Sequence, residues 1–238
     1  MKAPAKIIPS DLIKSYTLNG TIGIEDWYFD DSGAFKGRQY DVKDFTSMII
    51  AAKAKEVKNY PQTDALLHEA LIKFPIENKI VVIMGSGNPW YEAIAIANGC
   101  KHCYVIEYQK RYLEHPMVTY LTVEEYAANP IQFDYGISIS SFEHDGLGRY
   151  GDPLNPDGDL QAMVNMKSII KKDGFFYLAV PTGTDKVVWN AHRIYGKIRL
   201  PMLLKDWKLI STYGDIKLDI DLGKDAPSQP LFILQNTI

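Results

Sequence analysis

The stretch Lys79-Ile-Val-Val-Ile-Met-Gly-Ser-Gly-Asn-Pro-Trp90 joins a short apolar run, mostly β-branched, to a glycine-rich turn. A continuous apolar run of this length is typical of a strand that is buried on both faces, as in a parallel sheet. Pro89 suits the first position of a helix, because the N–H that proline lacks would have no partner there. The stretch therefore predicts a strand, a tight turn and a helix in succession.

The same alternation of strands and helices continues along the rest of the chain. Further strands are expected at residues 104–107, 118–121, 133–140, 175–180, 207–213 and 230–236. Helices are expected at residues 89–98, 123–128, 160–170 and 186–206, and Lys171, Lys172 and Gly174 are expected to end the third of these. Strands and helices that alternate with short loops predict an α/β fold, a Rossmann-like, doubly wound and mostly parallel sheet.

Residues 1–75 precede this pattern as an N-terminal extension. Residues 1–40 are rich in turn formers and show no clear period, which predicts an irregular lead-in. Two helices follow, one that starts near Val42 with Asp44 as its cap and one that Thr63 or Asp64 caps. The expected division is an extension, 1–75, helical from about residue 42, and a Rossmann-like domain over 76–238.

Composition and charge exclude several classes of protein. The 238 residues carry a formal charge of −3, whereas sequence-independent binding of nucleic acid needs an excess of Lys and Arg. No apolar run approaches the roughly 20 residues that cross a bilayer, and the first residues lack the apolar stretch of a secretory signal. We therefore expect a cytoplasmic protein with no membrane span and no nucleic-acid partner.

The two cysteines, Cys100 and Cys103, form a C-x-x-C pair. Such a pair occurs in redox sites and as half of a zinc site, but no second pair of ligands follows at a suitable spacing. We favour two thiols at the start of a buried strand.

The glycine-rich turn is the expected ligand site, because ligands of doubly wound sheets bind beyond the carboxyl ends of the strands. A dinucleotide fingerprint, G-x-G-x-x-G, would need a glycine where Trp90 stands. S-adenosylmethionine has no pyrophosphate to cradle, and Glu107, which ends the second strand, would bind its ribose hydroxyls. An acid at this spacing also occurs in NAD sites, so Trp90 alone favours S-adenosylmethionine. A turn without a ligand and a surface Glu107 remain the alternative.

The segment Phe133-Asp-Tyr-Gly-Ile-Ser-Ile-Ser-Ser-Phe-Glu-His144 resembles the fourth-strand motif of class I S-adenosylmethionine-dependent methyltransferases. With segments 85–92, 143–159, 180–183 and 190–196 it resembles an uncharacterised family first catalogued from Caenorhabditis proteins, specifically over about residues 81–201. The resemblance implies a class I methyltransferase-like fold with S-adenosylmethionine as cofactor and S-adenosylhomocysteine as product. Family members in a glycan-synthesis context imply a glycan or other small-molecule acceptor. Pro89 departs from the common glycine motif of the methyltransferases, in which a third glycine often stands at this position.

The loop over residues 141–159 is rich in polar residues and glycine, which is typical of a functional loop. His144 is the expected general base, because an imidazole of ordinary pKa, about 6.5, accepts a proton near neutrality. Asp145 is its substitute, and a structural histidine is the alternative. Carboxylates at Asp152, Asp157 and Asp159 suit a hard cation, but turn formation explains them better and no metal is predicted.

The acceptor is expected to meet basic side chains after the fifth strand. Arg193 and Lys197 would share one face of the helix expected there and could engage an anionic or polyhydroxyl acceptor, although a solvated basic face is equally consistent.

These observations together predict an S-adenosylmethionine-dependent O-methyltransferase that acts on a sugar hydroxyl. The expected cofactor-binding residues are Gly85, Ser86, Gly87, Pro89, Trp90, Glu107, Tyr108, Thr122, Val123, Ser140 and Ser141. The expected acceptor-binding residues are Arg149, Tyr150, Asp152, His192 and Arg193. An enzyme that binds NAD(P) or a nucleotide sugar, and a non-catalytic protein of the same fold, are the alternatives.

Overall fold

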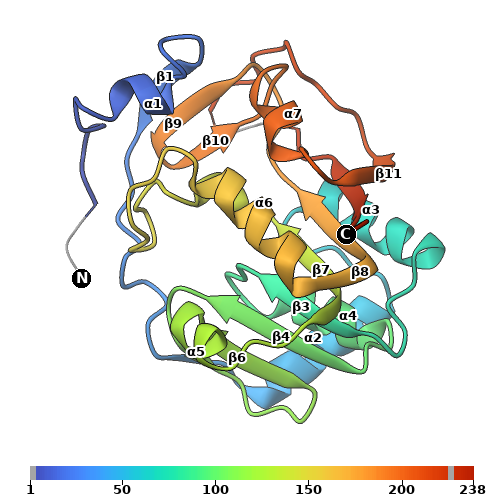
Figure 1. The fold of residues 1–238 in the computed structure, drawn as a ribbon. Helices are drawn as coiled ribbons and strands as arrows, with labels where there is room; N and C mark the ends of the chain where they lie inside the picture. Colours follow the sequence, from blue (N-terminus) through green and yellow to red (C-terminus); the bar gives the residue numbers. More distant parts are fainter. Residues whose placement is uncertain (1–3, 225–227) are drawn as a thin grey trace.

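A seven-stranded sheet forms the centre of the computed structural model, which describes residues 4–224 and 228–238 (Figure 1). Its order is β11-β12-β8-β7-β3-β4-β6. The strands are β3 (Ile80–Met84), β4 (His102–Glu107), β6 (Val118–Thr122), β7 (Phe133–Ile139), β8 (Ile170–Ala179), β11 (Lys208–Tyr213) and β12 (Leu231–Gln235). β12 runs antiparallel to both of its neighbours, β11 and β8, and the other neighbouring pairs in this sheet are parallel. The predicted doubly wound, mostly parallel sheet is confirmed, with its switch point between β3 and β7.

Helices cover both faces of this sheet (Figure 1). One face carries α2 (Val42–Lys53), α3 (Pro61–Lys73) and α4 (Trp90–Ala97), and the other carries α5 (Val123–Ala128), α6 (Gly158–Ile169) and α7 (Arg199–Leu203). The alternation of side chains along a strand explains the two cores, because Val81 and Ile83 pack in one and Val82 in the other. The continuous apolar run therefore reflects burial on both faces.

Most of residues 4–40 forms turns and loops, as predicted, but three short regular elements lie among them. After α1 (Ile13–Tyr16), strand β1 (Gly23–Trp27) pairs in parallel with β9 (Lys186–Asn190), which pairs with β10 (His192–Ile194). A second short pair joins β2 (Arg38–Gln39) to β5 (Arg111–Tyr112). The extension thus packs against the segment that follows β8.

The prediction of a helix over residues 186–206 is wrong, because the range contains β9, β10 and only one short helix, α7. Val187, Val188 and Trp189 are buried and β9 lies between β1 and β10. Partners for these residues come from elsewhere in the chain, so the local pattern does not reveal them. Arg193 and Lys197 consequently share no helix face.

Three details at helix ends differ from the predictions. Asp41, rather than Asp44, caps α2, since its Oδ1 accepts hydrogen bonds from the N–H groups of Lys43 and Asp44. Pro61 begins α3, so neither Thr63 nor Asp64 caps it.

The end of α6 also differs, because Lys171, Lys172 and Gly174 lie in β8 and not at a helix terminus. A Cβ on Gly174 would lie 2.3 Å from the backbone oxygen of Asp134. This glycine therefore permits the close approach of β7 and β8, and it does not end a helix.

Three further observations complete the description of the fold. Cys100 and Cys103 are buried free thiols at the start of β4, as expected. No helix within the described ranges is long and apolar enough to cross a membrane. Within those same ranges, no three His, Cys, Asp or Glu side chains gather as a metal site would require.

Candidate functional site

A cavity of about 730 Å³ opens at the carboxyl ends of β3, β4 and β7. Residues 84–88, 106–109 and 139–142 line it from these three strands, and α5, α6 and residues 58–60 supply its walls. Binding pockets for small molecules commonly have volumes of about 300–1,000 Å³. The cavity therefore lies where doubly wound folds bind ligands and has room for a nucleoside-sized molecule.

The two glycines of the turn after β3 serve different purposes. Gly85 has φ of +72°, and a Cβ there would lie 1.9 Å from Ser141 Oγ. Only glycine lets the two loops touch at this point. A Cβ on Gly87 would meet no protein atom within 4 Å, and this residue lines the cavity. Gly87 thus leaves open space for a ligand, whereas Gly85 holds the site together.

The side chains of this turn bond within the protein. Ser86 Oγ donates to Glu92 Oε2 at 2.9 Å, and Glu92 Oε1 accepts from the hydroxyl group of Tyr120 at 2.6 Å. Glu92 is fully buried, which raises its pKa. Asn88 Oδ1 accepts a hydrogen bond from the N–H of Trp90 at 3.1 Å, although the N-cap residue of α4, Pro89, provides no side-chain cap. The polar side chains of the turn thus bond to groups of the protein itself.

Glu107 ends β4 at the rim of the cavity. Its Oε1 accepts a hydrogen bond from the N–H of Ser86 and lies 3.1 Å from Arg111 Nη1. Burial raises the pKa of Glu107 to about 7, although Arg111 and the Ser86 N–H favour its charged form. Arg111 also lies over the ring of Phe35, 4.4 Å from its centroid, so the N-terminal extension covers this part of the site.

Asp64 fixes the wall at residues 58–60. This buried carboxylate accepts hydrogen bonds from the N–H groups of Lys58 and Asn59, at 2.8 and 3.0 Å. It also accepts from Trp90 Nε1 at 2.8 Å and from the Tyr91 hydroxyl group at 3.0 Å. Trp90, expected to bind cofactor, is therefore an anchor of α4 and does not line the cavity.

The loop after β7 begins with a strained residue. Ser140 has φ of +52°, a left-handed conformation that is uncommon for residues other than glycine and clusters at functional sites. Ser140 Oγ donates to Glu143 Oε1 at 2.6 Å and accepts from Gln229 Nε2 at 2.9 Å. Burial raises the pKa of Glu143 to about 7.

His144 lies at the cavity wall in one defined tautomer. Its Nδ1 is 2.6 Å from the carbonyl oxygen of Ala191, and a carbonyl only accepts, so Nδ1 carries the proton. Nε2 is then free to accept a proton. Burial and the charge of Arg149 lower the pKa of His144 to about 3, so the ring is neutral at physiological pH. The expectation of an ordinary histidine pKa is wrong for this reason.

Four of the five expected acceptor residues lie outside the cavity lining. Arg149 donates to Asp31 Oδ2 at 2.7 Å and stacks on Phe29, so it secures the N-terminal extension. Asp152 accepts from the N–H groups of Gly146 and Gly148 at 2.7 and 3.0 Å, which is turn chemistry.

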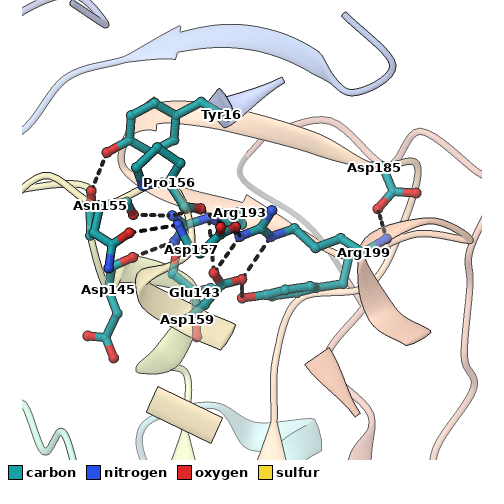
Figure 2. A network of polar contacts seen from close by, with 12 residues as sticks. Tyr16, Glu143, Asp145, Asn155, Pro156, Asp157, Asp159, Asp185, Arg193 and Arg199 are labelled. Atoms are coloured by element: carbon teal, nitrogen blue, oxygen red, sulfur yellow. Dashed lines mark hydrogen bonds and ion pairs between the residues drawn. The ribbon is translucent and has the colours of Figure 1, made fainter. Parts of the chain in front are cut away.

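The other two of these residues lie beneath the loop. His192 packs edge-on against Trp27. Arg193 is fully buried and belongs to the polar network shown in Figure 2. Its Nη1 donates to the backbone oxygen of Asp145 at 2.6 Å, and its Nη2 donates to that of Pro156 at 3.2 Å. Both ends of the loop are thus held by one guanidinium group.

Asp159 stabilises that network with a second arginine (Figure 2). Arg199 Nη2 donates to Asp159 Oδ1 at 2.5 Å, and the Tyr195 hydroxyl group donates to Oδ2 at 2.9 Å. Burial alone would raise the pKa of Asp159, but Arg193 and Arg199 hold it below its usual range. Figure 2 shows the carboxyl group of Asp145 turned away from Arg193, and Asp145 lines the cavity.

The cavity brings together part of the predicted set. Its lining includes Gly85, Ser86, Gly87, Glu107, Tyr108, Val123, Ser140, Ser141, His144, Asp145 and Tyr150. It does not include Pro89, Trp90, Thr122, Arg149, Asp152, His192 or Arg193. Thr122 instead caps α5 in a capping box with Glu125. Lining residues that the sequence did not indicate include Phe35, Asn59, Tyr60, Gln109, Arg111, Tyr126, Gln161 and Asn165. None of them belongs to a short motif.

Comparison with known proteins agrees with this fold. The crystal structure of a "putative RNA methyltransferase" from Pyrococcus horikoshii has a TM-score of 0.50 at 14% identity and covers 83% of this chain and 100% of that chain. The structure of the 1,6-didemethyltoxoflavin-N1-methyltransferase of Burkholderia thailandensis, with bound S-adenosylhomocysteine, has a TM-score of 0.49 at 15% identity. It covers 83% of this chain and 82% of that chain. At 14% identity the likeness to the Pyrococcus structure shows the fold alone.

A family comparison is more specific. No curated protein matches the sequence significantly. Residues 78–234, more than half of the chain, match the family described as "Caenorhabditis protein of unknown function, DUF268". The resemblance inferred from the sequence motifs is thereby confirmed: the chain belongs to the DUF268 family and has the fold of class I S-adenosylmethionine-dependent methyltransferases.

Proposed function

We propose that the cavity binds S-adenosylmethionine and that the protein transfers its methyl group to a hydroxyl oxygen of a sugar. The observation that carries this proposal is Glu107, a buried carboxyl group at the end of β4, directly across from the turn after β3. A carboxylate accepts hydrogen bonds from two neighbouring hydroxyl groups, as a ribose offers them. Gly87 would then face the cofactor across open space.

The charges around the cavity support a cationic cofactor over a dinucleotide or a nucleotide sugar. Lys58 and Arg111 are the lysine and arginine among the lining residues, and Arg111 is paired with Glu107. Burial raises the pKa of Asp145, which lines the cavity, and the pKa of Glu92, which lies beneath the turn. The scarcity of cations is therefore what separates the ligands: a diphosphate would find few positive partners here, whereas a sulfonium ion needs none.

The acceptor would approach through the aromatic part of the lining. Phe35, Tyr60, Tyr108 and Tyr150 lie there together with the polar side chains of Gln109 and Asn155. Aromatic faces combined with a few hydrogen-bonding groups are what a sugar ring requires. The glycan-synthesis context of the family points to the same acceptor class.

His144 would remove the proton of the acceptor hydroxyl group. Ala191 fixes its tautomer, so Nε2 is the free acceptor at the cavity wall. S-adenosylmethionine supplies an activated methyl group, and the protein contributes alignment of the acceptor and removal of one proton. Asp145, which also lines the cavity, would hold a second hydroxyl group or replace His144 as proton acceptor.

Calorimetric titration tests the cofactor class. We expect S-adenosylhomocysteine to bind with a dissociation constant in the micromolar range, about −8 kcal/mol, and NADH to give no heat of binding. Binding of NADH or of a uridine-diphosphate sugar, without a response to either adenosyl compound, would contradict the proposal and favour the alternative Rossmann enzymes.

A further inference from the structure

Glu143 is a buried carboxyl group whose hydrogen bonds are incomplete. Its side chain is 1% exposed, and Oε1 accepts from Ser140 Oγ at 2.6 Å. Oε2 is buried and has no hydrogen-bond partner among the described residues. Burial of an acid without full hydrogen bonding is unfavourable, and such groups in a native structure need a specific explanation.

The nearest ionisable partner of Glu143 is His144. The distance from Glu143 Oε1 to His144 Nε2 is 3.7 Å. Because Ala191 holds the proton on Nδ1, Nε2 is the nitrogen that would gain positive charge on proton uptake. A carboxylate at this distance favours the protonated ring, whereas a neutral carboxyl group does not.

We propose that Glu143 is a positioning residue for proton removal, in which its carboxylate stabilises the imidazolium form of His144. The inference rests on the proposed methyl transfer. In that step the O–H bond of the acceptor breaks and its proton goes to His144 Nε2. The oxygen forms a bond to the methyl carbon, and the electron pair of the broken S–C bond stays on sulfur. The proton then leaves Nε2 for water.

The surroundings of the pair support ionisation of Glu143 near neutral pH. Burial raises the pKa of Glu143 to about 7, while burial and Arg149 lower that of His144 to about 3. Two groups this close titrate as a unit. The charged and titratable groups that face the pair are Arg149, Arg193, His192, Asp145, Tyr60, Tyr150 and Tyr195. The pair therefore gains its full basicity only above about pH 7.

Nitrogen NMR of the full chain, labelled with ¹⁵N-histidine, tests the coupling without any ligand. The Nε2 signal of His144, among five histidines, is identified by its loss in His144→Gln. We expect this signal to show an inflection near pH 7 in the wild type and none in Glu143→Gln. Glu92→Gln is the matched control, because Glu92 is equally buried but bonds to Ser86 and Tyr120. It should leave the inflection in place.

A second variant tests the same coupling if the Glu143→Gln protein does not fold. Ser140→Ala removes the hydrogen bond that favours the charged form of Glu143, so the inflection should move up by about one pH unit. An inflection that survives Glu143→Gln, that Glu92→Gln also removes, or that Ser140→Ala leaves unmoved would overturn the inference. Titration with S-adenosylhomocysteine separates this result from the proposed function, since the NMR signal requires no cofactor.

Discussion

Gly85 and Ser141 meet where the loops after β3 and β7 come together, so closely that a Cβ on Gly85 would lie 1.9 Å from Ser141 Oγ. These two strands flank the switch point of the sheet, and their loops form the floor of the cavity. The contact explains why a glycine stands directly after the strand whatever ligand binds beyond it. It also separates the structural role of this residue from the role proposed for Gly87.

Alanine at these two glycines should therefore have opposite effects. Gly85→Ala should lower the free energy of unfolding by about 2–4 kcal/mol, because the left-handed φ and the contact with Ser141 are both unfavourable. Gly87→Ala should change stability by less than about 1 kcal/mol and weaken S-adenosylhomocysteine binding by about tenfold. Denaturant unfolding and calorimetry check the two quantities. Equal effects of the two variants on affinity would contradict this division of roles.

The buried acid Glu143 should make stability depend on pH. Its pKa is raised from 4.5 to about 7, so the folded state loses stability as pH rises through that window. As pH rises from 4.5 to 8, the free energy of unfolding of Glu143→Gln should therefore increase by up to about 3 kcal/mol relative to that of the wild type. His144 acts in the opposite direction, because its lowered pKa removes stability as pH falls from 6.5 to 3. Urea unfolding at several pH values measures the difference, and a pH-independent difference would rule out the raised pKa.

His144→Gln should lower turnover by about a hundredfold, the usual scale for loss of a general base. Affinity for S-adenosylhomocysteine should stay within about threefold, because the imidazole acts on the acceptor. His102→Gln is a control, since His102 lies at the opposite end of β4 and bonds to Thr119. A well-folded His144→Gln protein with full turnover would exclude His144 as the proton acceptor.

Two ion pairs of similar length should differ in importance. Arg199→Met leaves the buried Asp159 without its closest cation, which should destabilise the protein by about 3–5 kcal/mol. Lys197→Met breaks an exposed pair with Asp219 and should cost less than about 1 kcal/mol. Thermal unfolding compares the variants. A small effect of Arg199→Met would show that the network in Figure 2 does not hold the loop.

The sequence predicts those parts of the fold that short-range patterns determine. Buried strands such as β3 follow from apolar runs, and α5 lies where the sequence predicts a helix, although its cap, Thr122, is one of the residues expected to bind the cofactor. The prediction fails for β9, because this strand depends on pairing with β1 about 160 residues earlier in the chain. Valines and a tryptophan in that segment fit either a strand or a buried helix until the partner is known.

The residues of the candidate site likewise fall into those that the sequence predicts and those that only the folded structure reveals. Glu107 and His144 are accessible to sequence reasoning, because Glu107 ends a buried strand and His144 lies in the loop that follows another. Arg193 is not, because only the fold places its guanidinium group under the backbone oxygens of a distant loop. The raised pKa of Glu143 likewise arises from burial in the folded chain, and nothing in the local sequence indicates it.

The measurement that tests the account most directly compares S-adenosylhomocysteine binding by the wild type and Glu107→Gln. A neutral amide keeps the size of the side chain but loses the charge-assisted hydrogen bonds to the ribose. At pH 8, above the raised pKa of Glu107, we expect micromolar binding by the wild type and affinity at least tenfold weaker for the variant. Equal affinities, or no binding by a folded wild-type protein, would contradict the assignment of this cavity to S-adenosylmethionine.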